Sequence, residues 1–439
     1  MKSYTIIGKG GREHALALLL ARDHQVYSFG GSDAIRAVAQ PLDSGLAVAL
    51  DSALEEDGLE ALLSRPESTI VFGPEQPMAA GWVDQIHRKA PAAQLLGPNQ
   101  YAAQLESSKW WAKEFMTRNQ VPTGAAQRIK TVTDFDRFAR QFQPPYVIKA
   151  DGLAAGKGVA IFQEEKPARE FAQGIVNGDL FGAPQTALIE EFLAGPELSI
   201  FLLLDGSGAV QIGTARDYKR AYDRDEGPNT GGMGSFTPVP DVSDDDQREI
   251  YETILRPILD GLKRDSIFYR GFLYVGLIRT AHGFKVLEFN VRLGDPETQA
   301  VLPVVSDHLG DLLASAAAGR LADVSQQPWM ETVAEDFGRV RTNRAAVCVV
   351  LASHGYPGSS PSGLVLEGLT TLEQELTANQ YLFHAGTKKN SEGAWLTNGG
   401  RVLNIVHTAD TVADAREKSY ALIDRLHLTP LRCRRDIAR

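Results

Sequence analysis

The sequence predicts a multidomain protein with α/β and α+β parts. Its 439 residues correspond to about three compact units at the usual ~150 residues per domain. In the first hundred residues, short apolar segments that end in glycine-containing turns alternate with helical stretches, a pattern typical of a parallel α/β sheet. Beyond residue 105, strands separated by polar turns are mixed with helices, which favours α+β folding. We therefore expect an N-terminal parallel α/β domain followed by a two-part α+β domain and a C-terminal α+β domain.

The N-terminal domain is expected to span residues 1–104. Residues 4–7 are predicted to form a buried strand, residues 8–11 a glycine turn and residues 12–21 a helix with an apolar face. Further strands are predicted at 26–29, 69–72 and 94–96. Ligands of parallel α/β sheets bind at the carboxyl ends of the strands, so the turns after these strands are candidate binding elements.

The middle domain is expected to span residues 105–328, with a lid at about 124–193. Residues 146–149 and 159–162 are predicted to pair as a hairpin with a long glycine-rich tip. Other strands are predicted at 186–189, 198–204, 271–278 and 285–289, and helices at 107–119, 164–176, 244–264 and 307–318.

The last domain is expected to span residues 329–439. Strands are predicted at 345–351 and 401–406, and a helix at 412–426. The basic residues Arg432, Arg434 and Arg435 near the end are interpreted as a solvated segment, because short charge runs are usually exposed.

Composition excludes several classes of protein. Hydrophobic residues make up 43% and charged residues 23% of the chain, which is incompatible with general disorder. The formal net charge of −10 argues against a nucleic-acid partner. Cys348 and Cys433 are too few for a disulfide framework, which favours a reducing cytoplasm. The apolar runs are too short for a membrane helix, so no membrane partner is expected.

The segment from Lys149 to Val159 is a candidate phosphate-binding flap. Gly152, Gly156 and Gly158 would let the backbone approach a polyphosphate, and Lys149 and Lys157 would supply positive charge. The spacing differs from the strand-to-helix P-loop, and a strand follows. A flexible hairpin with solvated lysines remains the alternative interpretation.

A second candidate segment follows the strand at 186–189. Phe192 or Leu193 would contact an adenine ring after the acidic pair Glu190 and Glu191, and Glu197 would accept hydrogen bonds from ribose hydroxyls. Considered alone, this pattern is more typical of surface glutamates at the end of a strand.

A third candidate group lies on the strand that ends near residue 290. Alternation places Glu288, Asn290 and Arg292 on one face, with Leu287, Phe289 and Val291 on the other. Oxygen ligands on a rigid strand suit Mg²⁺, which usually shares its coordination with substrate phosphates. A solvated strand face with a Glu–Arg pair is the alternative.

The order of these motifs along the chain is more specific than any one of them. They are, in sequence, residues 8–14 (GKGGREH), 73–75 (GPE), 149–159, 190–197, 227–234 and 288–299, followed by 383–388 (FHAGTK) and 397–402 (TNGGRV). Together they resemble the ATP-grasp ligases, and most closely the phosphoribosylamine–glycine ligase family of purine biosynthesis. The resemblance covers nearly the whole chain.

The resemblance implies a role for each matching position. A lid and a core domain would enclose ATP as substrate together with Mg²⁺ or Mn²⁺. The implied nucleotide contacts are Lys109, Lys149, Gly152, Gly156, Gly158, Glu190, Glu191, Phe192, Leu193 and Glu197, the metal ligands are Glu288 and Asn290, and the catalytic residues are Lys157, Asp217 and Arg292. The implied substrate contacts are Gly10, Gly11, Arg12, Glu13, Gly231, Gly232, Met233 and Gly234.

The N-terminal turn is expected to bind the phosphate of the second substrate. Backbone N–H groups of Gly10 and Gly11 at a helix start, with Arg12 beside them, would form an anion site. A dinucleotide site is disfavoured, because Val26 to Phe29 is followed by two glycines where an acidic residue would be needed.

The implied reaction joins glycine to 5-phosphoribosylamine with cleavage of ATP through a glycyl phosphate, in a monomer or weak homodimer. Residues 29–33 and 216–218 depart from the family pattern, so an ATP-grasp ligase with another carboxylate or another amine remains an alternative. A non-catalytic nucleotide-binding scaffold is the third possibility.

Overall fold

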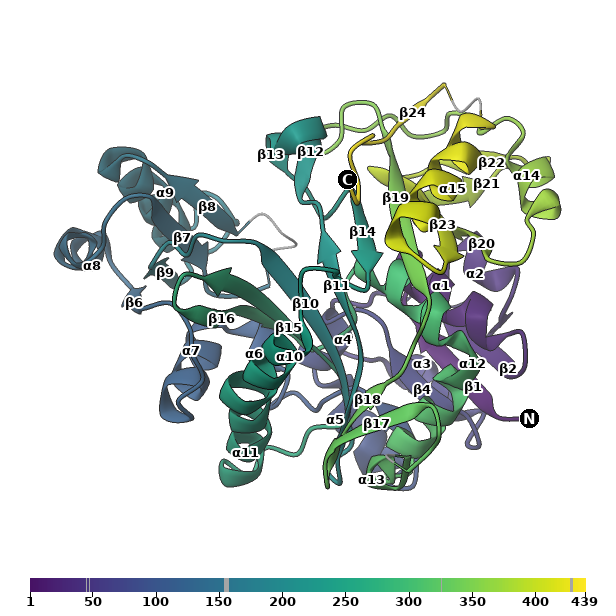
Figure 1. Cartoon of the computed structure of the whole chain (residues 1–439), viewed down its shortest axis with the longest axis horizontal. Coiled ribbons are helices and arrows are strands. Elements are labelled where there is room, and N and C mark those ends of the chain that lie inside the picture. Colours follow the sequence, from purple (N-terminus) through teal and green to yellow (C-terminus); the bar gives the residue numbers. More distant parts are fainter. Residues whose placement is uncertain (45, 47, 154–157, 325, 427–428) are drawn as a thin grey trace.

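The first hundred residues form a parallel sheet with the strand order β3-β2-β1-β4-β5 (Figure 1). The computed structural model describes residues 1–439 except 45, 47, 154–157, 325 and 427–428. The strands of this sheet are β1 (Ser3–Ile7), β2 (Gln25–Phe29), β3 (Gln40–Pro41), β4 (Thr69–Phe72) and β5 (Leu95–Leu96). The helices around it are α1 (Gly11–Leu20), α2 (Asp33–Arg36), α3 (Glu56–Leu63), α4 (Gln76–Ala79) and α5 (Trp82–Lys89). The predicted parallel α/β architecture is confirmed.

Two helices, α6 (Gln104–Ser107) and α7 (Lys109–Arg118), lead from this sheet to a four-stranded antiparallel sheet that we call the lid. The lid strands are β6 (Ala126–Ile129), β7 (Tyr146–Ala150), β8 (Val159–Phe162) and β9 (Ala187–Glu190), and its helices are α8 (Val132–Phe138) and α9 (Glu165–Asn177). The predicted β7–β8 hairpin is present, with Lys149 opposite Val159. Figure 1 shows the lid standing apart from the rest of the molecule. Its described residues enclose a hydrophobic core of their own.

The middle and C-terminal parts of the chain share one sheet of eleven strands, with the main order β16-β15-β10-β11-β14-β19-β23-β20. Its strands are β10 (Glu197–Leu204), β11 (Ala209–Asp217), β14 (Gly234–Thr237), β15 (Gly271–Thr280), β16 (Gly283–Asn290), β17 (Met330–Ala334), β18 (Phe337–Val340), β19 (Ala345–Ser353), β20 (Gln380–His384), β23 (Arg401–Ala409) and β24 (Leu431–Arg432). The ladder from β14 to β19 joins strands more than a hundred residues apart.

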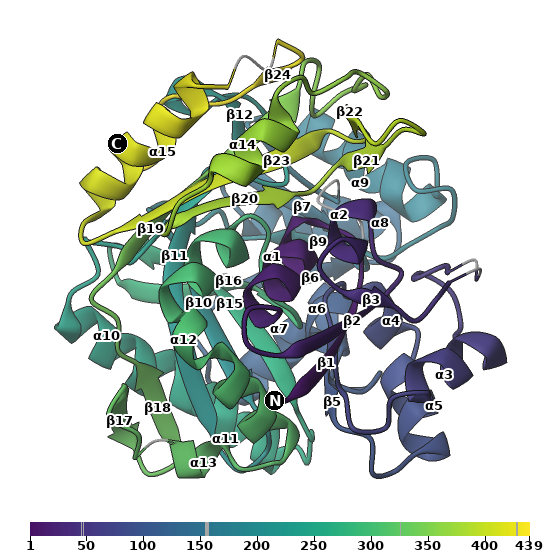
Figure 2. The ribbon, with the colours of Figure 1, turned by 90° about the vertical axis from the view of Figure 1, so that its right-hand side faces the viewer.

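Helices and two small ribbons complete the fold. The helices are α10 (Asp244–Ile250), α11 (Arg256–Arg264), α12 (Glu297–Ala317), α13 (Leu321–Val324), α14 (Leu369–Glu375) and α15 (Val412–Asp424). The ribbons are β12 (Arg220–Tyr222) with β13 (Glu226–Asn229), and β21 (Thr387–Lys389) with β22 (Trp395–Thr397). Helix α12 packs against α1 and also against β11 and β19, so it connects the N-terminal sheet to the large sheet (Figure 2).

Three local predictions require correction. The helix expected at 307–318 begins ten residues earlier, at Glu297, and continues through Pro303. The helix expected at 244–264 contains a π-helical turn at Tyr251–Leu255. In β16 a bulge separates the pair Leu277–Val286 from the pair Gly276–Glu288, so Leu287 has no partner and the simple alternation fails there.

No helix among the described residues is long and apolar enough to cross a membrane.

Candidate active site

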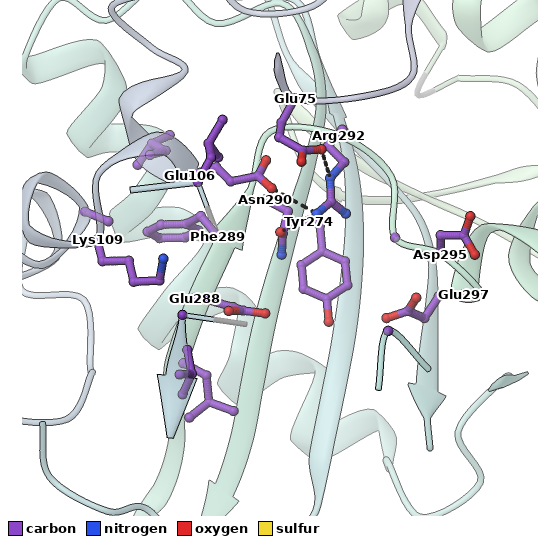
Figure 3. A pocket seen from close by; sticks show the side chains of 18 of the residues that line it. Glu75, Glu106, Lys109, Tyr274, Glu288, Phe289, Asn290, Arg292, Asp295 and Glu297 are labelled. Atoms are coloured by element: carbon purple, nitrogen blue, oxygen red, sulfur yellow. Dashed lines mark hydrogen bonds and ion pairs between the residues drawn. The ribbon is translucent and has the colours of Figure 1, made fainter. Parts of the chain in front are cut away.

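A cavity of about 430 Å³ lies where the N-terminal sheet, the lid and the large sheet meet, and Arg401 from the C-terminal part of the chain also lines it. Fifteen of the described residues that line it carry charged side chains, and several of them are drawn in Figure 3. Figure 3 shows Lys109 on one side, Glu288 and Asn290 in the middle, and Asp295 and Glu297 on the opposite side. We call the Lys109 side the cationic end and the Asp295 side the acidic end.

At the cationic end, Glu190 lies between two lysines. One carboxylate oxygen of Glu190 is 3.0 Å from Nζ of Lys149 and 3.1 Å from Nζ of Lys113. The other oxygen, Oε1, is buried without a hydrogen-bond partner among the described residues. Burial alone would lower the pKa of Lys149, but Glu190 and Glu288 outweigh it and raise that pKa. Lys149 therefore keeps its charge.

Lys109 lies beside the tip of the β7–β8 hairpin. Its Nζ donates a hydrogen bond of 2.9 Å to the carbonyl oxygen of Gly152. Burial lowers the pKa of Lys109, with partial compensation from Glu288. Gly152 and Gly158 both line the cavity. Lys157 and Gly156 lie outside the described residues, so their predicted roles remain predictions.

The predicted adenine and ribose segment is only partly at the cavity. Glu190 lines it, whereas Glu191, Phe192, Leu193 and Glu197 are not among the lining residues that the structure describes. Phe192 is 39% exposed. Glu191 accepts a hydrogen bond from the backbone N–H of Ala125 at 3.1 Å. Glu197 accepts one from Nζ of Lys219 at 2.7 Å. The apolar residues that line the cavity are instead Leu105, Ala112, Met116, Leu153, Val159, Leu287 and Phe289.

Strand β16 carries the candidate metal ligands. Glu288 and Asn290 both line the cavity, downstream of the bulge at Leu287. The described part of the chain holds no cluster of three or more His, Cys, Asp or Glu side chains that could bind a metal. Two hard oxygen donors beside a cationic end fit Mg²⁺, which is commonly held by one or two side chains with phosphates and water.

Arg292 is held by acidic residues from other parts of the chain. Its Nε donates to Glu75 at 3.0 Å, and its second terminal nitrogen donates to Glu106 and to Oδ1 of Asn290, each at 2.9 Å (Figure 3). Its remaining terminal nitrogen donates to the carbonyl oxygen of Leu293. Four of the five N–H groups of Arg292 are therefore used within the protein.

Glu75 and Glu106 were not among the predicted site residues. Glu75 follows β4, at the carboxyl end of a parallel strand, so its position was a usable signal. Glu106 lies on the short helix α6 and carried no local signal. Burial raises the pKa of Glu106 to about 7, although Arg292 opposes the shift.

The acidic end contains Asp217, Asp295 and Glu297. Burial raises the pKa of Glu297 to about 7, and the neighbouring carboxylate of Asp217 adds to the shift. Two cations face these acids. Lys219 is 3.0 Å from Asp217, and Arg401 is 3.3 Å from Asp295. Sequence reasoning proposed Asp217 but omitted Glu297, Lys219 and Arg401.

The glycine-rich loop contributes one predicted residue directly. Gly231 lines the cavity, and its carbonyl oxygen accepts a hydrogen bond of 2.6 Å from Arg401. Gly232, Met233 and Gly234 are not among the described lining residues. Gly232 has a φ of +110°, and a Cβ there would lie 2.5 Å from Pro296. The glycine at 232 is therefore required by backbone conformation and packing.

The N-terminal turn reaches the cavity with Gly10, Arg12 and Glu13. Its hydrogen-bond donors are mostly used within the protein. The N–H of Gly10 donates to Glu13 at 2.6 Å, and the N–H of Arg12 donates to Asp295 at 3.2 Å. The Arg12 guanidinium donates to Glu13 and to the carbonyl oxygen of Leu293. Gly11 is buried against Asn404 and Gln299 and is not among the described lining residues.

Three family models match the chain. Their descriptions are the N domain of phosphoribosylglycinamide synthetase at residues 2–106, its ATP-grasp (A) domain at 107–298 and its C domain at 346–439.

Curated relatives and solved structures agree with these matches. Phosphoribosylamine–glycine ligase of Escherichia coli is 38% identical over 98% of this chain and 97% of its own length, and that of Caldanaerobacter subterraneus is 37% identical over 99% and 98%. The crystal structure of the Thermotoga maritima phosphoribosylamine–glycine ligase is 32% identical, with a TM-score of 0.81 and coverage of 99% and 100%. The biotin carboxylase domain of Hydrogenobacter thermophilus 2-oxoglutarate carboxylase shares the fold at 17% identity, with a TM-score of 0.71 and coverage of 98% and 92%. The chain therefore belongs to the phosphoribosylglycinamide synthetase family of ATP-grasp ligases.

Proposed function

We propose that this chain ligates glycine to 5-phosphoribosylamine, with cleavage of ATP to ADP and phosphate, as a step of purine biosynthesis. The observation that carries the proposal is the polarity of one cavity: lysines at one end, three carboxyl groups at the other, and Glu288 with Asn290 between them. Family membership supports glycine and phosphoribosylamine as the substrates, because the relatives that match over nearly their full length are named for them.

ATP binds at the cationic end. Lys109 and Lys149 attract the phosphates, and Gly152 and Gly158 let the hairpin backbone approach them. The unpaired Oε1 of Glu190 accepts a hydrogen bond from the exocyclic amino group of adenine. We keep Lys157, Gly156, Glu191, Phe192, Leu193 and Glu197 as further candidates that would contact the nucleotide when the lid closes.

Glu288 and Asn290 would hold the divalent cation, Mg²⁺ or Mn²⁺. When bound, the ion would neutralise charge on the transferring phosphoryl group. The solved relative from Hydrogenobacter thermophilus was crystallised with MgADP, which supports a divalent cation for this fold. Asn290 keeps its side chain oriented through the hydrogen bond from Arg292.

The acidic end receives the two substrates that carry amines. A glycine carboxylate oxygen attacks the γ-phosphorus, and the bond from that phosphorus to the β–γ bridging oxygen breaks, releasing ADP. The nitrogen of phosphoribosylamine then attacks the acyl carbon, the bond to the phosphate oxygen breaks, and phosphate leaves. Asp217 and Asp295 accept hydrogen bonds from the ammonium group of glycine and from the neutral amine of phosphoribosylamine. Glu297, with its pKa of about 7, accepts the proton that the attacking amine loses.

The remaining assignments follow from the same scheme. Arg292 offers one N–H group to the acyl phosphate, and Gly231 with Arg401 borders the bound amine. The turn at Gly10 to Glu13 contacts the ribose phosphate on the side of the cavity that it lines. We divide the chain into domains at 1–104, 105–328 and 329–439, and we expect a monomer or weak homodimer.

The test is release of phosphate from ATP by the purified protein, with product mass measured in parallel. Release should require both glycine and freshly prepared phosphoribosylamine, and the product should have the mass of glycinamide ribonucleotide. Glu288→Gln should reduce turnover by at least about a hundredfold, because the cation site loses its only charged ligand. Turnover with a different amino acid, or none with fresh amine, would contradict the assigned substrates.

A further inference from the structure

The segment 432–439 is built into the fold, although the sequence suggested a solvated end. The side chain of Arg434 is 1% exposed. Its Nε and one terminal nitrogen bind the two oxygens of Asp436 at 2.7 Å each, which is a bidentate pair. The guanidinium also lies over the ring of Tyr218, with its central carbon 4.8 Å from the ring centre. A buried guanidinium with this many partners has a fixed position.

This segment binds the first strand of the β12–β13 ribbon and the 3₁₀ turn Asp223–Asp225 that connects its two strands. The second terminal nitrogen of Arg434 donates to Asp225 at 2.8 Å and to the carbonyl oxygen of Arg220 at 3.1 Å. Arg432 donates to the carbonyl oxygen of Ala221 at 2.7 Å, and the N–H of Arg435 donates to Asp223 at 2.8 Å. Figure 1 shows the C-terminal end of the chain near the ribbon.

The ribbon is continuous at its base with the acidic end of the cavity. Lys219 directly precedes β12, and Thr230 and Gly231 directly follow β13; all three line the cavity. The base is closed by two hydrogen bonds, since the N–H and the hydroxyl of Thr230 both donate to the carbonyl oxygen of Lys219, at 2.7 Å and 2.8 Å. If the ribbon moved, Lys219 on one side of its base would therefore move together with Thr230 and Gly231 on the other.

A second contact connects the same segment to the strand below the ribbon. Ile437 is fully buried, and a Cβ at Gly234 would lie 2.9 Å from its side chain. Tyr218 is hydrogen-bonded to the backbone of Met233 and Gly234. Its N–H donates to the carbonyl oxygen of Gly234, and its carbonyl oxygen accepts from the N–H of Met233. The hydroxyl of Tyr218 in turn accepts a hydrogen bond from the N–H of Ala438.

We propose that Arg434 is a positioning residue for the acidic end of the cavity: by holding the β12–β13 ribbon it sets where Lys219, Thr230 and Gly231 stand against the amine-bearing substrates. Arg434 itself is not among the described residues that line the cavity, so it acts through the ribbon. Among the hydrogen bonds of the described residues, none joins the segment 432–439 to the cationic end of the cavity. The inference rests on the proposed ligation of glycine and phosphoribosylamine.

The test compares three variants of the full chain. Arg434→Lys keeps a positive charge but cannot bind Asp436, Asp225 and the Arg220 carbonyl oxygen at once. Asp225→Ala removes a partner from the ribbon side, at a side chain that is largely exposed. Arg435→Ala is the matched control, because its guanidinium pairs with Asp424 on α15 and not with the ribbon.

Arg434→Lys and Asp225→Ala should each raise the KM for glycine or phosphoribosylamine about tenfold, since substrate-contacting groups lose their alignment. The KM for ATP should change less than twofold, and Arg435→Ala should match the wild type. If Arg434→Lys unfolds, Asp225→Ala decides the result alone. Equal increases in all three KM values, or none in either variant, would overturn the inference. Absence of ligation in the wild type would instead overturn the proposed function.

Discussion

Two buried carboxyl groups in the cavity have pKa values near 7, and they arise from different surroundings. Glu297 faces other acids, and Asp217 adds to the effect of burial. Glu106 is raised by burial even though it bonds Arg292 and the backbone N–H of Val291. Glu297 is therefore suited to accepting a proton, whereas Glu106 holds the guanidinium of Arg292 in place. Experiments on single residues can therefore separate proton transfer from structural support.

Glu297→Gln should remove the acidic limb of the pH profile for turnover. In the wild type, the ionised form that accepts the amine proton increases as pH rises through about 7, so kcat should rise and then level off. In the variant, kcat should be lower by on the order of a hundredfold and should lack this rise. Steady-state rates from pH 5.5 to 8.5 test this. An unchanged profile in the variant would remove Glu297 from the mechanism.

Glu106→Gln should gain stability relative to the wild type as pH rises from about 4.5 to 7. A carboxyl group whose pKa is raised on folding takes up a proton, so its contribution to the free energy of unfolding falls as pH increases through this window. The relative gain should reach roughly 3 kcal/mol at most, at ~1.4 kcal/mol per pH unit.

Urea unfolding of both proteins at pH 5, 6, 7 and 8 measures this difference. Glu114→Gln, on the exposed face of α7, is the control and should show a constant difference from the wild type. A pH-independent difference for Glu106→Gln would mean that Glu106 titrates in its ordinary range.

At the scale of elements, Lys113 of α7 joins the core to both ends of the lid. Its Nζ donates to Oγ1 of Thr123 at 2.9 Å and to the carbonyl oxygen of Gly124 at 3.0 Å, just before β6, and it pairs with Glu190 at the end of β9. Burial lowers the pKa of Lys113, while Glu190 opposes the shift. One side chain thus fixes the two places where the chain enters and leaves the lid.

Lys113→Met should increase backbone hydrogen exchange at Thr123 to Ala126 and raise the KM for ATP severalfold. The variant removes the Lys113 donor from the buried Gly124 carbonyl oxygen and the partly buried Thr123 hydroxyl, and it leaves Glu190 with Lys149 alone, a loss of about 2–3 kcal/mol. Lys166→Met, on the exposed side of α9, is the matched control. Exchange by mass spectrometry and ATP titration check both. If the variant exchanged faster but bound ATP normally, Lys113 would hold the base of the lid without contributing to nucleotide binding.

Elements with a strong local pattern were predictable, and those that depend on distant partners were not. The β7–β8 hairpin and α15 follow from apolar periodicity between turn residues. Strand β14 is four residues long and is stabilised by β19, far along the chain, so no local signal marks it. In the site, Glu288 and Asn290 were predictable from a motif, whereas Glu106 and Lys113 are ordinary helix residues in sequence and gain their roles only through tertiary packing.

At the scale of the whole molecule, the hydrophobic cores divide the chain into two units. One large core combines residues from Ile7 to Ile437, and a second combines residues from Tyr4 to Val406, so the N-terminal, middle and C-terminal parts share their interiors. The core of the lid contains only residues between Ile129 and Ile189. We therefore expect the lid to open or unfold while the remainder stays intact.

Hydrogen exchange over the whole chain should separate these two units. The described lid residues should exchange together and faster than β10, β15 and β19, which should share one slow rate because they belong to a single sheet. A non-hydrolysable ATP analogue should slow exchange in the lid. If β19 exchanged as fast as the lid, or at a rate different from that of β10, the large sheet would not unfold as one cooperative unit.

The hydrogen bonds of Arg292 bear on inhibitor design. A carboxylate or phosphonate group that is meant to bind this guanidinium in a bidentate fashion finds only one N–H that no described residue uses, because Glu75, Glu106, Asn290 and the Leu293 carbonyl oxygen take the others. A basic group directed at Glu297 is the better choice, because Asp217 and Asp295 already face Lys219 and Arg401. Selectivity over other nucleotide-dependent enzymes would then come from the acidic end of the cavity, opposite the proposed ATP site.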